Sequence, residues 1–174
     1  MHQASKIFLI GFMGSGKSTT GRKLASQLNW SFIDLDEKIE EMEGMKIPDI
    51  FSLKGEPYFR KLETKALKEM KSETNTVIST GGGTPCFGDN MYFMLSSGLT
   101  IYLKMTPASL KKRLTKLSEG RPLLKSIDRK DLLEYITSKL EEREKWYSMA
   151  EIIVSNFNTD LSDLLSLIKK QIRQ

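Results

Sequence analysis

The first residues of the chain with an evident chemical role form a phosphate-binding motif. Residues 11–18 read GFMGSGKS and match the pattern G-x-x-x-x-G-K-[ST] in full, behind an apolar run and ahead of a stretch with helical spacing. Glycines let successive backbone N–H groups turn toward one anion, and the start of the following helix adds partial positive charge. Lys17 supplies a point charge to the β and γ phosphates, and the Ser18 hydroxyl is a ligand for Mg²⁺. The motif predicts a nucleoside triphosphate bound with magnesium.

Two carboxylates follow the second apolar run, in the segment FIDLD. Asp34 and Asp36 are two residues apart, so on an extended strand both point to the same side. Beside a triphosphate they repel it unless magnesium or a polyol lies between. One carboxylate can hold the metal's water shell while the other accepts hydrogen bonds from substrate hydroxyls. The alternative is that DLDEK only caps the next helix.

Three glycines, at positions 81–83, stand directly behind the third apolar run. Glycine loses more chain entropy on folding than other residues and offers no side chain for packing. At a strand end these residues let a ligand rest against bare backbone and receive an N–H. The glycines therefore indicate a surface against which the acceptor of a phosphoryl group would rest. We expect a β-carbon at Gly82 to crowd the bound acceptor.

An arginine occupies a core position of a long predicted helix. The apolar stripe of this helix contains Leu133, Ile136, Leu140, Arg143 and Tyr147. A buried guanidinium needs an anionic partner. Either a structural salt bridge or the carboxylate or phosphate of a ligand fits its planar fork.

For two other arginines, the sequence gives a weaker indication of a functional role. Arg60 and Glu63 are three residues apart, a spacing that by itself is typical of an ion pair on a helix surface. Arg121 lies between Gly120 and Pro122 in a segment without periodicity. In a kinase such a segment can close over the nucleotide and set an arginine against the transferring phosphate.

Alternating strands and helices must position these residues. Strands are expected at 6–12, 30–36, 76–80, 99–105 and 150–155, and helices at 17–28, 90–97, 107–117, 128–147 and 160–172. Glycines and prolines divide 37–70 into two or three short helices, and Asp128 is expected to cap the long helix. This alternation predicts an α/β fold with a parallel sheet covered on both faces. Ligands of such sheets bind outside the carboxyl ends of the strands, where the motif, the carboxylates and the glycines fall.

Composition narrows the class of protein. The 174 residues fit one domain, and 39% hydrophobic and 28% charged residues are ordinary for a soluble protein. No apolar run approaches the ~20 residues of a membrane span, and no signal-peptide pattern precedes the first strand. The net charge of +5 is spread along the chain, which does not favour nucleic-acid binding. With a single cysteine, Cys86, we expect a cytoplasmic protein, and we expect it to be a monomer.

Missing motifs exclude other nucleotide-binding classes. A GTPase switch normally carries N-K-x-D and a D-x-x-G after a strand, and the sequence has neither. A motor or large ATPase is usually longer, with an acid after four apolar residues. Small size, an early acid and a basic loop late in the chain indicate a small-molecule kinase.

Six motifs in this order resemble the shikimate kinase family: GFMGSGKST, FIDLD, GEPYFRKLE, STGGGTPC, GRPLL and the R-x-x-x-Y that begins at Arg143. The resemblance covers essentially the whole chain. It implies a three-layer P-loop kinase fold of the nucleoside-monophosphate-kinase type, with a five-stranded parallel sheet flanked by helices. A single domain, 1–174, would have a substrate-binding helical segment at about 34–62 and a mobile lid at about 116–126. The implied reaction converts ATP and shikimate to ADP and shikimate 3-phosphate, a step of aromatic amino-acid biosynthesis.

The resemblance also implies a role for each matching residue. The catalytic residues would be Lys17, Asp36 and Arg121, and Mg²⁺ would bind Ser18 and, through water, Asp34. ATP would contact Gly14, Ser15, Gly16, Lys17, Ser18, Thr19, Arg121 and Arg113, although Lys112 matches the adenine-side arginine equally well by position. Shikimate would contact Asp36, Arg60, Gly81, Gly82, Gly83 and Arg143. The segment 155–158 would lie against the base.

Two rivals remain at this point. Another small-acceptor kinase, for gluconate or a nucleoside monophosphate, would need no site for both a ring carboxylate and a neutral polyol. A regulatory module from a different class would bind ATP without transferring phosphate. ADP release that depends on the acceptor separates the kinases from the module.

Overall fold

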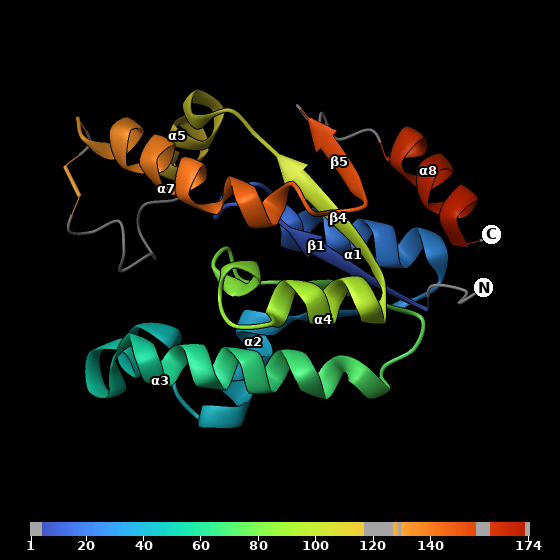
Figure 1. The fold of residues 1–174 in the computed structure, drawn as a ribbon, viewed down its shortest axis with the longest axis horizontal. Helices are drawn as coiled ribbons and strands as arrows, with labels where there is room; N and C mark the ends of the chain where they lie inside the picture. Colours follow the sequence, from blue (N-terminus) through green and yellow to red (C-terminus); the bar gives the residue numbers. More distant parts are fainter. Residues whose placement is uncertain (1–4, 117–126, 129, 156–160, 173–174) are drawn as a thin grey trace.

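A parallel sheet of five strands forms the centre of the fold (Figure 1). The computed structural model describes residues 5–116, 127–128, 130–155 and 161–172. The strands are β1 (Lys6–Ile10), β2 (Ser31–Asp34), β3 (Thr76–Ser79), β4 (Leu99–Lys104) and β5 (Ile152–Ser155), in the order β2-β3-β1-β4-β5. Every pairing is parallel, so all carboxyl ends meet at one edge. The predicted α/β sheet is confirmed.

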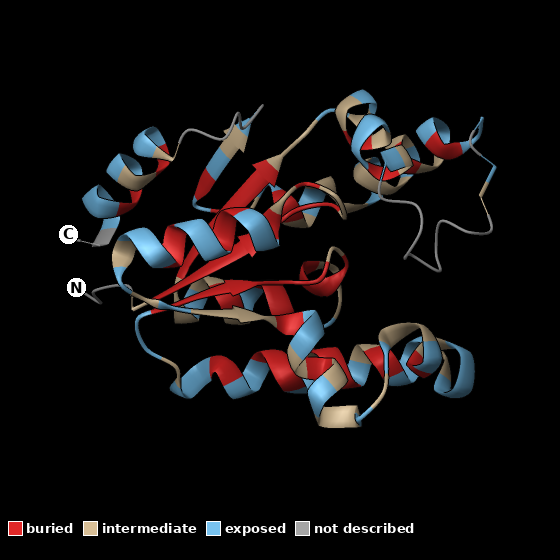
Figure 2. Cartoon of the chain, turned by 180° about the vertical axis from the view of Figure 1, so that it is seen from behind, coloured by how far each residue is buried: buried red, intermediate tan, exposed pale blue. Residues whose placement is uncertain are grey.

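Helices cover both faces of this sheet. They are α1 (Lys17–Leu28), α2 (Leu35–Glu43), α3 (Ile47–Glu69), α4 (Asn90–Ser97), α5 (Pro107–Lys116), α7 (Leu132–Tyr147) and α8 (Ser162–Ile172), with 3₁₀ turns η1 (Met70–Ser72) and η2 (Thr84–Cys86). Phe8 and Ile10 of β1 pack toward α2, α3, α4 and α7, whereas Ile7 and Leu9 pack toward α1 and α8. The inner strands β1, β3 and β4 are therefore buried on both sides, as Figure 2 shows, which explains their continuous apolar runs, whereas the edge strands β2 and β5 are partly exposed.

The segment between β2 and β3 forms a separate helical layer below the sheet in Figure 1. It contains α2 and α3, and α3 bends at Gly55, where φ is 78° and ψ is 168°. Only glycine readily adopts this conformation, and Pro57 behind it lacks an N–H for the helix. The predicted break of 37–70 into short helices is thereby confirmed.

Two expectations about the long helix are wrong. Helix α7 begins at Leu132, and the carbonyl of Asp128 instead accepts the N–H of Asp131 at 3.0 Å, in a turn before the helix. Leu133 is 39% exposed, whereas Leu132 is buried. The buried stripe begins at Leu132 because it lies one turn before Ile136, on the same side of the helix.

None of the described helices combines the length and the apolar character that crossing a bilayer requires.

Candidate active site

A cleft with a volume of about 620 Å³ opens at the carboxyl ends of the strands, between the phosphate loop and the α2–α3 layer. The described residues that line it come from the phosphate loop (11–18), the ends of β2 and β3, α2, α3, the glycine loop (81–83), α5 and α7. Among them are Gly14, Gly16, Lys17, Ser18, Thr19, Asp34, Asp36, Arg60, Gly81, Gly82, Gly83, Arg113 and Arg143. Most of the site residues expected from the sequence thus share one cleft.

The phosphate loop joins β1 to α1 through three glycines with positive φ. These values are 143° at Gly11, 79° at Gly14 and 93° at Gly16, a region that favours glycine. The Lys17 ammonium crosses the loop and donates to the carbonyl oxygens of Gly11 at 2.8 Å and Phe12 at 3.0 Å. The loop is therefore curved around its own lysine, next to the N-terminus of α1.

Ser15 and Arg113 lie at the outer side of this loop. The Ser15 N–H donates to the Phe12 carbonyl at 3.1 Å, and its hydroxyl is buried with no hydrogen-bond partner among the described residues. Arg113 Nη1 donates to the Ser15 carbonyl at 3.4 Å and lines the cleft, whereas Lys112 is not among the described residues that line it. Of the two basic residues proposed for the adenine side, Arg113 is the one beside the loop.

Some of the sequence predictions fall outside the described residues. They are Arg121, residues 117–126 of the lid expected at about 116–126, and residues 156–158 of the segment 155–158 expected against the base.

Asp34 is the last residue of β2 and the N-cap of α2. One of its carboxylate oxygens accepts the N–H of Asp36 at 3.1 Å, and the other accepts the Ser18 hydroxyl at 2.6 Å. The Ser79 hydroxyl lies 3.3 Å from that of Ser18. The expectation that both aspartates lie on one extended strand is wrong, because the capping interaction starts a helix at Leu35. Asp34 therefore both caps α2 and lines the cleft, although the two roles were expected to be alternatives.

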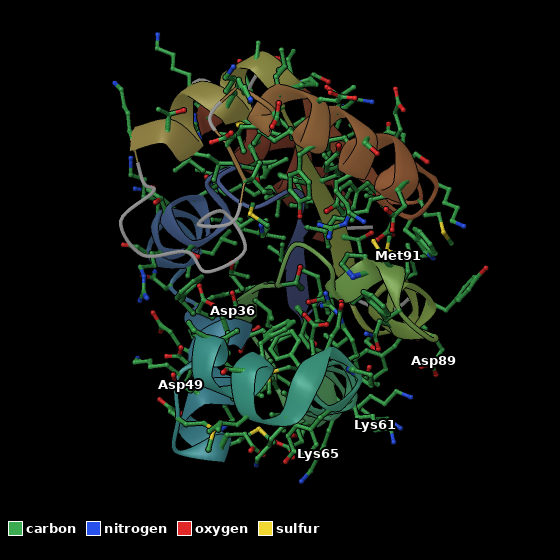
Figure 3. The ribbon with its side chains drawn as sticks, turned by 90° about the vertical axis from the view of Figure 1, so that its left-hand side faces the viewer. Asp36, Asp49, Lys61, Lys65, Asp89 and Met91 are labelled. Atoms are coloured by element: carbon green, nitrogen blue, oxygen red, sulfur yellow. The ribbon has the colours of Figure 1, made fainter. Side chains whose placement is uncertain are left out.

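Asp36 lies in the first turn of α2, at the edge of the helical layer that faces the strands (Figure 3). A β-carbon added at Gly81 would lie 3.2 Å from Asp36 Oδ1 and 2.7 Å from Glu63 Oε1. The aspartate that was expected on a strand is thus brought to the glycine loop by a helix. Lys61 and Lys65 of α3 point outward in the same view.

Arg60 and Glu63 do not form a surface pair. Glu63 is 1% exposed, and its carboxylate accepts the Arg60 guanidinium at 2.9 Å and the Thr84 hydroxyl at 2.6 Å. Arg60 also bonds Glu56 at 2.9 Å and lies over the Phe87 ring at 4.1 Å. These contacts hold the guanidinium at the cleft, where Arg60 is one of the lining residues.

Arg143 reaches the cleft from α7 with its guanidinium 5.4 Å above the Phe12 ring. Its Nη1 is buried and has no hydrogen-bond partner among the described residues. Burial acts to lower the pKa of Arg143, but attraction to and a hydrogen bond with Tyr147, together with attraction to Cys86 and Tyr135, outweigh it, and the pKa lies above its ordinary value. The sequence left two partners open for Arg143, a structural salt bridge and an anionic ligand. The described residues provide no salt bridge, which favours the ligand.

The glycine loop lies between these groups, and its glycines provide space. A β-carbon on Gly83 would lie 2.8 Å from Arg60 Nη1, and one on Gly82 would lie 3.1 Å from the Met13 nitrogen. The expectation that a side chain at Gly82 crowds the acceptor is therefore revised. It would first displace the phosphate loop, whose backbone packs against this glycine.

Three residues at or behind the cleft receive no site role from the sequence. Glu63 is expected only as an ion-pair partner, and Thr84 and Tyr147 occur only within the motifs STGGGTPC and R-x-x-x-Y. In the structure the buried Glu63 carboxylate accepts the Thr84 hydroxyl, and the Tyr147 hydroxyl donates to the Gly82 carbonyl at 2.5 Å. Cys86 is partly buried behind this loop, and burial raises the pKa of its thiol to about 11, as expected for a packed residue rather than a nucleophile.

A phosphate loop between β1 and α1 of a parallel sheet, facing carboxylates and arginines across one cleft, defines a P-loop kinase of a small-molecule acceptor. The family model described as shikimate kinase matches residues 13–173. The chain therefore belongs to the shikimate kinase family, and its activity is that family's ATP-dependent phosphoryl transfer to shikimate.

Individual relatives agree with this assignment. A shikimate kinase of Azobacteroides pseudotrichonymphae is 42% identical over 96% of this chain and 99% of its own length. The solved shikimate kinase of Bacteroides thetaiotaomicron has a TM-score of 0.86 at 40% identity and covers 95% of this chain and 94% of its own. The enzyme of Acinetobacter baumannii, solved in complex with shikimate, has a TM-score of 0.86 at 32% identity over 98% of this chain and 93% of its own.

Proposed function

We propose that this cleft transfers the γ-phosphoryl group of ATP to the 3-hydroxyl of shikimate, giving ADP and shikimate 3-phosphate, with the residue roles set out below. The observation that carries the proposal is the buried Nη1 of Arg143, which lacks a hydrogen-bond partner among the described residues. A buried guanidinium nitrogen in a ligand-sized cleft favours a carboxylate ligand, which matches its planar fork. Arg60 lines the same cleft and provides a second cation for that carboxylate.

The acceptor's hydroxyl groups would meet Asp36 and the glycine loop. Asp36 lies against Gly81, so its carboxylate can accept a hydrogen bond from the reacting hydroxyl and orient its oxygen, or take its proton, while the loop offers backbone. Phosphoryl transfer depends mainly on such positioning and on charge stabilisation, with little covalent help from the protein. Asp36 acts here as the acceptor's orienting group or base.

The nucleotide's phosphates would occupy the loop from Gly14 to Thr19. Lys17 now bonds two loop carbonyls, and we expect it to exchange them for β and γ phosphate oxygens when ATP binds. A fixed ammonium and backbone N–H groups stabilise the charge that develops in transfer without having to reorganise. Arg113 adds a second cation at the outer side of the loop.

Oxygen ligands that suit magnesium meet at the mouth of the phosphate loop. The Ser18 hydroxyl lies 2.6 Å from Asp34 Oδ2 and 3.3 Å from the Ser79 hydroxyl, so the donor set is hard and compact. The described residues contain no cluster of three or more His, Cys, Asp or Glu side chains, which fits an ion bound by one or two protein oxygens, water and phosphates. Ser18 would bind it directly and Asp34 through water, and the ion would neutralise charge on the phosphates.

An ADP-release assay with different acceptors tests the proposal. The assay compares shikimate, gluconate, nucleoside monophosphates and no acceptor, each with ATP and MgCl₂ and again with excess EDTA. We expect rapid release with shikimate alone, and its loss in EDTA. Release at one rate with and without acceptor would contradict transfer to shikimate, and full activity in EDTA would contradict the role of magnesium.

We further propose that the protein is a cytoplasmic monomer. The single cysteine, Cys86, is a free thiol, which suits a reducing compartment. Light scattering during size-exclusion chromatography tests the monomeric state: a mass near 19.9 kDa is expected, and twice that value would contradict it.

A further inference from the structure

We propose that Tyr147 is a positioning residue of the acceptor site, whose hydroxyl fixes the peptide bond between Gly82 and Gly83. The inference rests on the proposed function, because it concerns the loop that would support shikimate. Tyr147 itself lines no part of the cleft among the described residues, so it would act through the glycine loop.

The phenol is held in one place by its surroundings. Tyr147 is fully buried, and its hydroxyl donates to the Gly82 carbonyl at 2.5 Å. Its ring packs on that of Tyr102, with centroids 4.9 Å apart and planes tilted by 38°. The Tyr102 hydroxyl bonds Glu144 at 3.4 Å, and Glu144 pairs with Lys104 of β4 at 2.5 Å. Tyr147 is thus braced by the sheet, and it presents a fixed donor to the loop.

The planarity of the peptide bond carries this constraint to the cleft. In a trans peptide the C=O and the following N–H point in opposite directions, so a fixed Gly82 carbonyl directs the Gly83 N–H away from Tyr147. Neither residue has a side chain, and glycine has the widest choice of φ and ψ. The Thr84 N–H bonds the Gly81 carbonyl at 3.2 Å and the Cys86 N–H bonds the Gly83 carbonyl at 2.9 Å, so these turn bonds hold the ends of the segment. Neither of them holds the peptide between Gly82 and Gly83, whose carbonyl is the one that Tyr147 binds. Burial raises the pKa of the Tyr147 phenol, which keeps it a donor.

Arg143 shares this arrangement. It lies one turn before Tyr147 on the same side of α7, and its Nη1 lies 3.5 Å from the place of a Gly82 β-carbon. The Met13 nitrogen lies 3.1 Å from the same point, on the phosphate loop. The Tyr147 bond therefore fixes Gly82 where the carboxylate-binding arginine and the phosphate loop meet.

Tyr147→Phe tests this inference, with Tyr102→Phe as the matched control. Each variant removes one buried phenol hydroxyl and keeps the ring pair, but only the first removes a bond to the glycine loop. Because Tyr147→Phe also removes the attraction of this hydroxyl to Arg143, the Gly83 resonance described below separates the two effects. We expect Tyr147→Phe to raise the KM for shikimate about five- to tenfold and to leave the KM for ATP within about twofold. In Tyr102→Phe both KM values should stay within about twofold of wild type.

Spectra of protein labelled with ¹⁵N-glycine provide a readout that is independent of activity. The Gly83 amide resonance should shift in Tyr147→Phe and stay in place in Tyr102→Phe. An unchanged shikimate KM, equal increases for both substrates, an unmoved Gly83 resonance or an unfolded Tyr147→Phe protein would overturn the assignment. Failure of the proposed function is distinct, because wild-type protein would then release no ADP with shikimate while the spectral comparison still reports on the loop.

Discussion

Two arginines in one cleft differ in how their charges are compensated. Arg60 bonds the buried carboxylate of Glu63 and the more exposed carboxylate of Glu56, so its environment is already anionic. Arg143 lies over an aromatic ring, with one buried nitrogen unpaired among the described residues. A ligand carboxylate therefore gains more from Arg143 than from Arg60, although both line the cleft. In the proposed acceptor site, Arg60 would orient the ligand and Arg143 would supply most of the uncompensated charge.

Replacing Arg143 by alanine should therefore weaken the binding of the acceptor and leave the binding of ATP nearly unchanged. A charge-assisted hydrogen bond contributes about 1.5–3 kcal/mol, so we expect the shikimate KM to rise roughly 10- to 150-fold and the ATP KM to stay within about twofold. Arg143→Lys should give an intermediate KM, because lysine keeps the charge but lacks the planar fork. Steady-state kinetics with each substrate varied in turn measures both constants.

Lys139→Ala is the control, since it removes a cation from the same helix at a side chain paired only with Glu142 in the described structure. Its kinetic constants should match those of wild type. An unchanged shikimate KM in Arg143→Ala would remove Arg143 from the acceptor site.

At the scale of elements, the bend in α3 builds one wall of the cleft. The half before Gly55 contributes Ile47, Pro48 and Phe51 to the lining, and the half after it contributes Phe59 and Arg60. Because the helix changes direction at Gly55, the direction from which each set of side chains approaches the cleft depends on this bend. The bend therefore belongs to the acceptor site as much as to the fold.

Gly55→Ala should lower the stability of the fold and weaken the binding of the acceptor. With φ at 78° and ψ at 168°, a β-carbon costs about 1–3 kcal/mol, which lowers Tm by several degrees in a chain of this size. As α3 relaxes, its first half moves, and the shikimate KM should rise severalfold. Calorimetry and kinetics measure the two effects.

Gly44→Ala provides the matched comparison. Its φ of 66° is also strained for alanine, but nothing lies within 4 Å of the added carbon. It should lower Tm by a comparable or smaller amount and leave the shikimate KM unchanged. A Gly55→Ala protein with wild-type Tm and KM would show that the bend has no role.

Periodicity and turn residues predict most elements but not how a segment divides between them. The parallel sheet, the phosphate loop and the break near Gly55 follow from local pattern, because apolar runs and glycines act within a few residues. FIDLD reads as one strand until Asp36, yet the Asp34 side chain caps a helix at Leu35. The burial of Glu63 and the bond from Tyr147 depend on residues 21 and 65 positions away, which no local signal reveals.

Across the whole fold, the site consists of two half-sites that are built on the same sheet, one for the nucleotide and one for the acceptor. The phosphate loop follows β1, the acceptor groups come from α2, α3, the glycine loop and α7, and β1 pairs directly with β3. Lys17 bonds the phosphate loop, whereas Arg143 lies across the cleft from α2. The two half-sites touch, since the Gly82 backbone packs against that of Met13 and Arg143 lies over the Phe12 ring. Each would nevertheless bind its ligand mainly through its own charged groups, Lys17 for the nucleotide and Arg143 for the acceptor, so each ligand should stabilise the fold by itself.

Thermal shifts in two variants test this independence. A ligand at 100 times its Kd stabilises the fold by about 2.7 kcal/mol, or roughly 5–10 °C for a chain of this size. Lys17→Ala should lose the shift with ATP and MgCl₂ and keep the shift with shikimate, whereas Arg143→Ala should do the reverse. Each shift is measured against the same variant without ligand, since loss of Lys17 leaves two buried loop carbonyls without their partner and lowers Tm by itself. If either substitution abolished both shifts, the phosphate loop and the acceptor groups would form a single cooperative site, and the cleft would have to be described as assembled by its ligands.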